Sequence, residues 1–83
     1  MSKFIKIYVD VILFYKKVGG MIPLFVVWED GRRFKIEKVI KIDRAAVRSG
    51  GLAKRYTCII KGQQKNLYLG NDNKWFFEQE LSD

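Results

Sequence analysis

The sequence predicts an all-β fold, a small and strongly bent barrel of about six strands. Two turn signals, Asp30-Gly31 and Gly62-Gln63, each lie between apolar runs, as in antiparallel strands joined by tight turns. Residues 54–61 alternate between apolar and polar, which is the period of a half-buried strand. A flat sheet of such strands would leave its edges and apolar face uncovered. We therefore expect closure into a barrel, SH3-like in preference to OB-like.

The composition is that of one folded domain, which we place over residues 1–83. Apolar residues make up 48% of the chain and charged residues 30%, which is not the composition of a disordered segment. The absence of His and the single Cys exclude a His-based triad, a Cys-rich zinc site and an intramolecular disulfide. The sequence also contains no complete phosphate-binding loop. We therefore expect no enzyme activity and no catalytic, cofactor or metal site.

The first strand is expected over residues 4–15, where a helical and an alternating apolar pattern both fit. The β-branched residues of this run favour a strand over a helix. Residues 11–15 are apolar on both faces, which is typical of a strand that bends and changes partners, or of one that is buried on both sides.

The central hairpin is expected to turn at Asp30-Gly31. A two-residue type I′ turn there would place Trp28 opposite Arg33 and Val27 opposite Phe34. Facing residues share one side of the sheet. The expected core side is Phe25, Val27, Phe34 and Ile36, and the expected outer side is Leu24, Val26, Trp28, Arg33, Lys35 and Glu37.

The next part of the chain is less regular. The third strand is expected to continue to Ile42, with Ile40 and Ile42 directed inward and a bulge near Lys38. Residues 43–53 are expected to form a loop, and the alternative is a short helix capped by Asp43, as an OB-like barrel would require.

The C-terminal part is expected to form two more strand pairings. The inward residues of the fourth strand would be Tyr56, Cys58 and Ile60. A type II′ turn at Gly62-Gln63 would then pair Cys58 with Leu67. A turn over residues 70–73 precedes the last strand, in which three consecutive aromatic residues, 75–77, leave the inward face undecided.

Nucleic-acid binding is one hypothesis for the function. Sixteen Lys and Arg residues against nine Asp and Glu give a net charge of +7, which attracts anionic partners. Cations around an exposed aromatic ring would meet phosphates while a base stacks on the ring. The candidate residues for such a face are Trp28, Arg33, Lys35, Lys41, Arg55 and Lys61.

Protein–protein interaction is the competing hypothesis, and it is slightly favoured. The expected outer face and the last strand carry more apolar surface than a small monomer normally exposes. The candidate patch is Leu24, Val26, Trp28, Trp75, Phe76 and Phe77. The partner would be another protein or a second copy of the chain, forming a homodimer.

Several segments resemble a family of small uncharacterised bacterial proteins, mainly from Gram-positive species. They are Ile22-Pro23 and residues 28–32, 34–36, 55–60 and 75–78. The resemblance implies an all-β bacterial protein of unknown function and transfers no site residues. The lone Cys58 and the absence of an apolar run of about 20 residues predict a cytoplasmic protein without integral membrane association.

Overall fold

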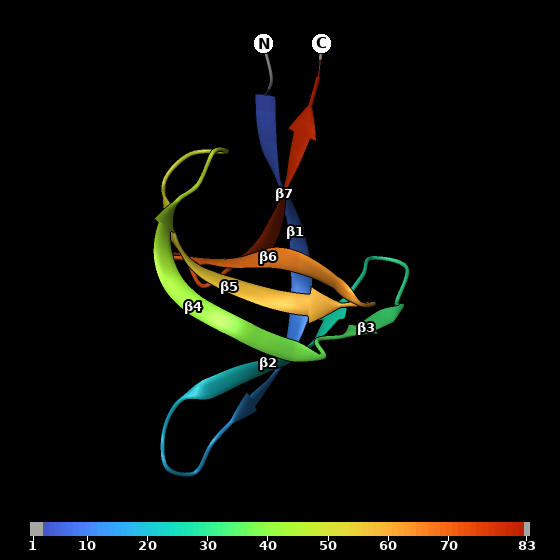
Figure 1. The fold of residues 1–83 in the computed structure, drawn as a ribbon, viewed down its shortest axis with the longest axis vertical. Coiled ribbons are helices and arrows are strands. Elements are labelled where there is room, and N and C mark those ends of the chain that lie inside the picture. Colours follow the sequence, from blue (N-terminus) through green and yellow to red (C-terminus); the bar gives the residue numbers. More distant parts are fainter. Residues whose placement is uncertain (1–2, 83) are drawn as a thin grey trace.

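The computed structural model describes residues 3–82 as a single antiparallel sheet of seven strands that curls into a half-barrel (Figure 1). The strands are β1 (Lys3–Tyr15), β2 (Met21–Val27), β3 (Arg33–Lys35), β4 (Lys38–Ala46), β5 (Leu52–Ile60), β6 (Gln63–Gly70) and β7 (Trp75–Leu81). Their spatial order is β3-β2-β1-β7-β6-β5-β4. The predicted all-β small barrel is confirmed, with seven strands in place of about six.

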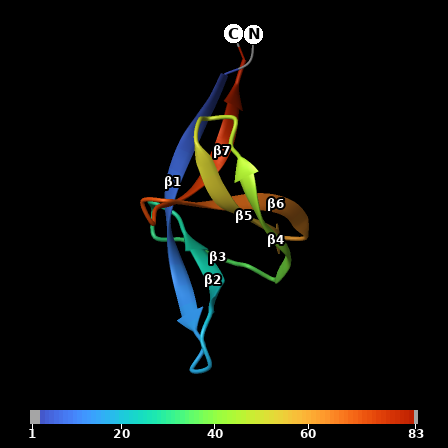
Figure 2. The ribbon, with the colours of Figure 1, turned by 90° about the vertical axis from the view of Figure 1, so that its left-hand side faces the viewer.

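Strand β1 joins the two halves of the sheet. From Lys3 to Val9 it pairs with β7, and from Asp10 to Tyr15 it pairs with β2. A bulge after Ile12 lies within the second half. Figure 2 shows β1 running along the molecule, beside β7 in the upper part and beside β2 in the lower part. The predicted change of partners is therefore confirmed.

The short link between β3 and β4 closes one side of the barrel. The Ile36 N–H donates to the Leu24 carbonyl of β2 at 2.9 Å, and the Glu37 N–H donates to the Ile59 carbonyl of β5 at 2.8 Å. The Glu37 carboxylate also accepts a hydrogen bond from the Gly62 N–H at 3.2 Å. These bonds hold the two edges of the curled sheet together.

The main core fills the concave side of the sheet. Its buried members are Val26, Ile36, Tyr56, Cys58, Ile60, Leu67 and Trp75. The predicted inward direction of Tyr56, Cys58 and Ile60 is confirmed. A second small core lies on the other face, around Val47, Ala53, Tyr68 and Phe76. The start of strand β7 is therefore buried on both sides, with Trp75 in the first core and Phe76 in the second, which explains its run of aromatic residues.

The predicted register of the β2–β3 hairpin is wrong by one residue. Val26 pairs with Phe34, and Val27 pairs with Arg33. The loop has three residues, with the Trp28 N–H donating to the Arg32 carbonyl at 2.8 Å and the third residue, Gly31, at φ +87°. This is a type I turn followed by a left-handed residue. A shift of one residue exchanges the two faces of a strand.

The one-residue shift changes which side chains of β2 lie in the core. Val26, expected outside, is only 1% exposed, and Phe25 and Val27, expected inside, lie on the outer face. Phe34 and Ile36 remain on the core side as predicted. Leu24 is exposed, as expected, while Trp28 is partly buried on the core side.

Two further expectations are corrected in β4. Residues 43–53 form neither a loop throughout nor a helix, because β4 extends to Ala46, β5 begins at Leu52 and only the turn between them is irregular. The bulge expected near Lys38 is present, between Val39 and Lys41. As a result Val39 packs against the core, while Ile40 and Ile42, expected inward, are 50% and 49% exposed.

The β5–β6 turn also differs from its prediction, without changing the core. Lys61 and Gly62, at φ +52° and +72°, form the turn in place of Gly62-Gln63. Cys58 therefore pairs with Lys65 and not with Leu67. The shift is two residues, so every side chain keeps its predicted face. The predicted turn over residues 70–73 is confirmed by a hydrogen bond from the Asn73 N–H to the Gly70 carbonyl at 3.0 Å.

Candidate interaction surfaces

The outer side of the β1–β2–β3 sheet carries a group of apolar side chains, which we name the outer apolar face. Cross-strand pairing puts them on one side of the sheet, since Ile12 lies opposite Phe25 and Phe14 lies opposite Ile22. The face consists of Ile12, Phe14, Ile22, Phe25 and Val27. On β1 these residues lie on the side for which the sequence predicted no packing partner. On β2 they lie on the side that the sequence predicted to be buried.

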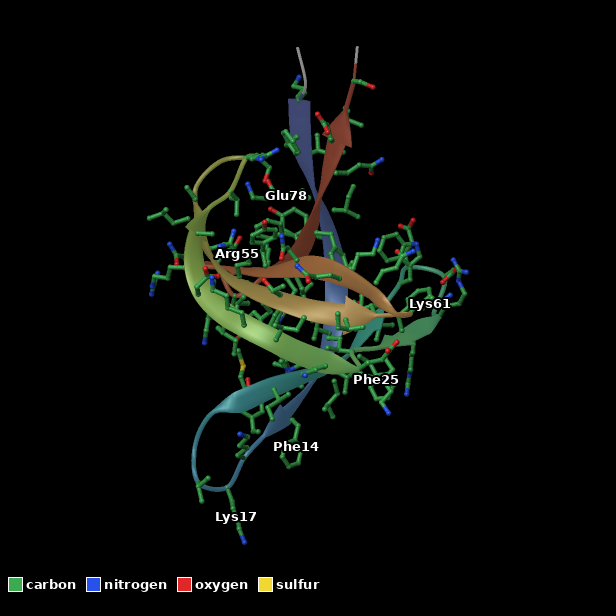
Figure 3. The ribbon with its side chains drawn as sticks, in the orientation of Figure 1. Phe14, Lys17, Phe25, Arg55, Lys61 and Glu78 are labelled. Atoms are coloured by element: carbon green, nitrogen blue, oxygen red, sulfur yellow. The ribbon has the colours of Figure 1, made fainter. Side chains whose placement is uncertain are left out.

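The outer apolar face is not covered by the described part of the chain. None of its members belongs to either core or packs against one. Phe14 is 52% exposed, and the other members are partly buried by one another and by their strand neighbours. Figure 3 shows Phe14 and Phe25 along the lower part of the molecule, away from Arg55 and Glu78. A contiguous apolar surface of this kind is typical of an interaction site.

Cations lie beside this face. Arg33 pairs with Val27, and Lys35 pairs with Phe25, so both stand on the same side of the sheet on its edge strand. Both are exposed, and within residues 3–82 neither forms an ion pair. The only acidic residue paired across from this face is Asp10, opposite Val27. The surface is therefore apolar at its centre and mainly cationic at its β3 edge.

The predicted interaction patch lies mostly inside the protein. Val26, Trp75 and Phe76 are buried, and Trp28 and Phe77 are partly buried on the core side. Only Leu24 is exposed, and it does not belong to the outer apolar face. The sequence did carry a signal for the outer apolar face, because residues 11–15 are apolar on both faces and one side of this segment had no assigned partner.

The six residues proposed for a nucleic-acid face do not come together. Arg33 and Lys35 lie beside the outer apolar face. Arg55 and Lys61 stand at opposite sides of the molecule in Figure 3. Trp28 and Lys61 line one hollow in the surface.

Arg55 forms an ion pair with Asp43 within the sheet. Its guanidinium donates to both carboxylate oxygens of Asp43, at 3.0 and 2.7 Å, and the Lys41 ammonium lies 3.6 Å from the same carboxylate. The hydrogen bonds from Arg55 hold the pKa of Asp43 below its usual value. Arg55 and Lys41 are thus partly neutralised where they stand, which weakens their attraction for a phosphate.

The hollow that contains Trp28 combines aromatic rings and cations. Its volume is about 440 Å³, and its walls include Phe34 and Phe77. The Lys61 ammonium lies 4.7 Å from the centre of the Phe34 ring, and the Arg32 guanidinium lies 5.5 Å from it. The ring is therefore already in contact with cations of its own chain.

The described residues offer no arrangement for metal binding. Within residues 3–82 no three His, Cys, Asp or Glu side chains lie close enough together to hold a metal ion. Cys58 is buried in the main core, and desolvation raises the pKa of its thiol, which disfavours the reactive thiolate. No helix suited to crossing a membrane occurs over the same residues.

No family model, curated protein or solved structure matches this chain. The resemblance to uncharacterised bacterial proteins therefore stays a prediction, and the function has to be argued from the geometry.

Proposed function

We propose that this protein is a non-catalytic binding module that docks another protein on the outer apolar face. The observation that carries the proposal is the group of apolar side chains on β1 and β2 outside both cores. Full burial of a Phe side chain contributes about 1.5–3 kcal/mol, so Phe14 and Phe25 could together anchor a partner. As the sequence predicts, we place this activity in the bacterial cytoplasm.

The charges beside the face define the partner. Arg33 and Lys35 favour a protein whose apolar contact surface has an acidic rim. A second copy of the chain would bring the same cations to the contact, and each copy carries a net charge of +7. We therefore propose a different protein as the partner, in preference to a homodimer.

Nucleic-acid binding remains the alternative predicted from the sequence. Its candidate cations are divided among separate surfaces, and Arg55 is paired with Asp43. The geometry therefore gives protein binding the stronger support.

The test compares the wild type with the double variant Phe14→Ser/Phe25→Ser. The control is Ile40→Ser/Ile42→Ser, which removes two half-exposed apolar side chains from β4. Each protein is immobilised and exposed to cell extract, and any protein retained by the wild type and the control but not by the Phe variant is purified. Its affinity is then measured by calorimetry. We expect the Phe variant to bind about 100-fold more weakly or worse, and the control to bind normally.

Equal affinity of the purified partner for the wild type and the Phe variant would contradict the proposal. Sedimentation equilibrium tests the homodimer. A mass that rises with concentration in the wild type and not in the Phe variant would replace the proposed partner by a second copy.

A further inference from the structure

Strands β6 and β7 meet over only a short length. Tyr68 pairs with Phe76, and Leu69 pairs with Trp75, and no other pair joins the two strands. Strand β6 pairs with β5 from Gln63 to Gly70, while β7 pairs with β1 from Trp75 to Leu81. Residues 63–67 of β6 and 77–81 of β7 therefore each have one backbone edge without a strand neighbour. We name the opening between them the β6–β7 cleft.

Two hollows lie on either side of this cleft. The one on the core side is about 440 Å³, and the one on the outer side is about 480 Å³. Both are lined by Lys65, Phe77 and Glu78, so the two hollows adjoin along the cleft. Residues 63–66 are exposed, which leaves the β6 edge accessible from solvent.

The two hollows differ in chemistry. The core-side hollow has apolar walls formed by Ile7, Trp28, Phe34, Ile60 and Phe77. The outer hollow is polar and contains Arg48, Arg55, Gln64, Asn66 and Tyr68. Glu78 is the only carboxylate that lines either one, and it accepts a hydrogen bond from the Ser49 N–H at 2.6 Å. Cations therefore outnumber carboxylates on both sides of the cleft.

We propose that an extended segment of a partner protein adds as a strand to the free edge of β6, with apolar and acidic side chains in alternation. Backbone hydrogen bonds to residues 63–66, which are exposed, would hold the segment. Successive side chains of a strand point to opposite faces, so one set enters the apolar hollow and the other set meets Arg48 and Lys65. This site is separate from the outer apolar face and does not depend on it.

A peptide fits this cleft better than a nucleic acid does. The free edge offers a row of backbone N–H and C=O groups, which another peptide backbone complements. The Phe34 ring in the core-side hollow is already in contact with the cations of Lys61 and Arg32. Single-stranded nucleic acid is therefore an outcome of the test and not the proposal.

The test uses a fluorescent peptide of about nine residues that alternates Val and Glu, titrated with the full-length protein while its anisotropy is followed. We expect saturable binding, together with amide hydrogen exchange that slows about tenfold or more at those residues of 63–66 whose N–H faces the cleft. The same peptide N-methylated at alternate residues cannot form the strand pairing, and we expect it to bind about tenfold more weakly or worse. A peptide with Lys in place of Glu should also lose binding.

Matched protein variants locate the site. Arg48→Glu/Lys65→Glu should reduce the affinity about tenfold or more, because both cations line the outer hollow, where the acidic side chains of the peptide would lie. Lys16→Glu/Lys17→Glu makes the same change in net charge on exposed residues beyond β1 and should have a much smaller effect. Phe14→Ser/Phe25→Ser should leave peptide binding unchanged, which separates this site from the outer apolar face.

Three results would overturn the proposal. The first is peptide binding that does not saturate up to about 1 mM protein. The second is equal affinity for the N-methylated and the unmodified peptide. The third is displacement of the Val–Glu peptide by a single-stranded oligonucleotide that slows exchange of the same amides. The last result would assign the cleft to nucleic acid.

Discussion

Tyr56 shows how a single side chain can stabilise the fold through its ring alone. It is fully buried, and its hydroxyl has no hydrogen-bond partner within residues 3–82. Its ring lies 5.1 Å from that of Trp75, and the Lys54 ammonium lies 5.3 Å from its centre. A buried hydroxyl without a partner costs about 1–3 kcal/mol. The packing of the ring therefore outweighs a penalty at the oxygen.

Removal of this hydroxyl should stabilise the protein. For Tyr56→Phe we expect the free energy of unfolding, measured by urea denaturation, to rise by about 1 kcal/mol, because a desolvation penalty disappears and the ring remains. Tyr8→Phe, at an exposed ring, is the control and should change little. A loss of about 1 kcal/mol or more in Tyr56→Phe would mean that the hydroxyl is satisfied in the folded protein.

The ion pair of Asp43 and Arg55 should make the stability of the protein depend on pH in the acid range. Hydrogen bonds from Arg55 lower the pKa of Asp43 below 3.8. A carboxyl whose pKa is lower in the folded state stabilises the protein above its unfolded pKa, and this contribution is lost as the pH falls through the folded value. Asp30 also has a lowered pKa, so only a comparison with a variant isolates Asp43.

We therefore expect Asp43→Asn to have a lower Tm than the wild type at pH values above 3.8, with a difference that shrinks as the pH falls below that value. Thermal unfolding between about pH 2 and pH 6 measures this difference. A difference that stays constant over the whole range would show that the ion pair does not contribute.

At the scale of the strands, the two hairpins show what the sequence can predict. Both turns were located to within one residue, because Gly adopts the positive φ that such turns require. The error in β5–β6 was two residues and left Tyr56 and Cys58 inward. The error in β2–β3 was one residue, because the loop includes Glu29 and the Asp30 carboxylate accepts the Arg32 N–H at 3.0 Å. That error explains why Val26 and Trp28 of the predicted interaction patch face the core.

The register of β2 can be tested with two adjacent valines. Val26 is buried in the main core, while Val27 lies on the outer apolar face. We expect Val26→Ala to lower the free energy of unfolding by about 2 kcal/mol and Val27→Ala to lower it by less than about 1 kcal/mol. The two-residue turn expected from the sequence implies the opposite order, so urea denaturation of both variants distinguishes the two registers.

The shape of the whole molecule separates its two candidate interaction sites. The chain is elongated, with extents of 45 × 26 × 22 Å, and the β1–β2 hairpin projects from one end in Figure 1. The outer apolar face lies on this hairpin, whereas the β6–β7 cleft opens where the strands of the barrel diverge. Neither site was predictable from hydrophobic alternation alone. The outer apolar face depends on the register of β2 and β3, which the sequence predicts wrongly by one residue. The β6–β7 cleft depends on the position at which these two strands cease to pair.

The proposed docking role depends first on the outer apolar face being open in the folded protein. The most direct measurement is the rate at which a thiol reagent labels Phe25→Cys and Val26→Cys under native conditions. Cys58 is fully buried and serves as the internal unreactive thiol. We expect Phe25→Cys to react within about tenfold of an unfolded thiol, while Val26→Cys reacts only as fast as the protein opens. Rapid labelling of Val26→Cys with protection of Phe25→Cys would contradict the register and the proposed docking face together.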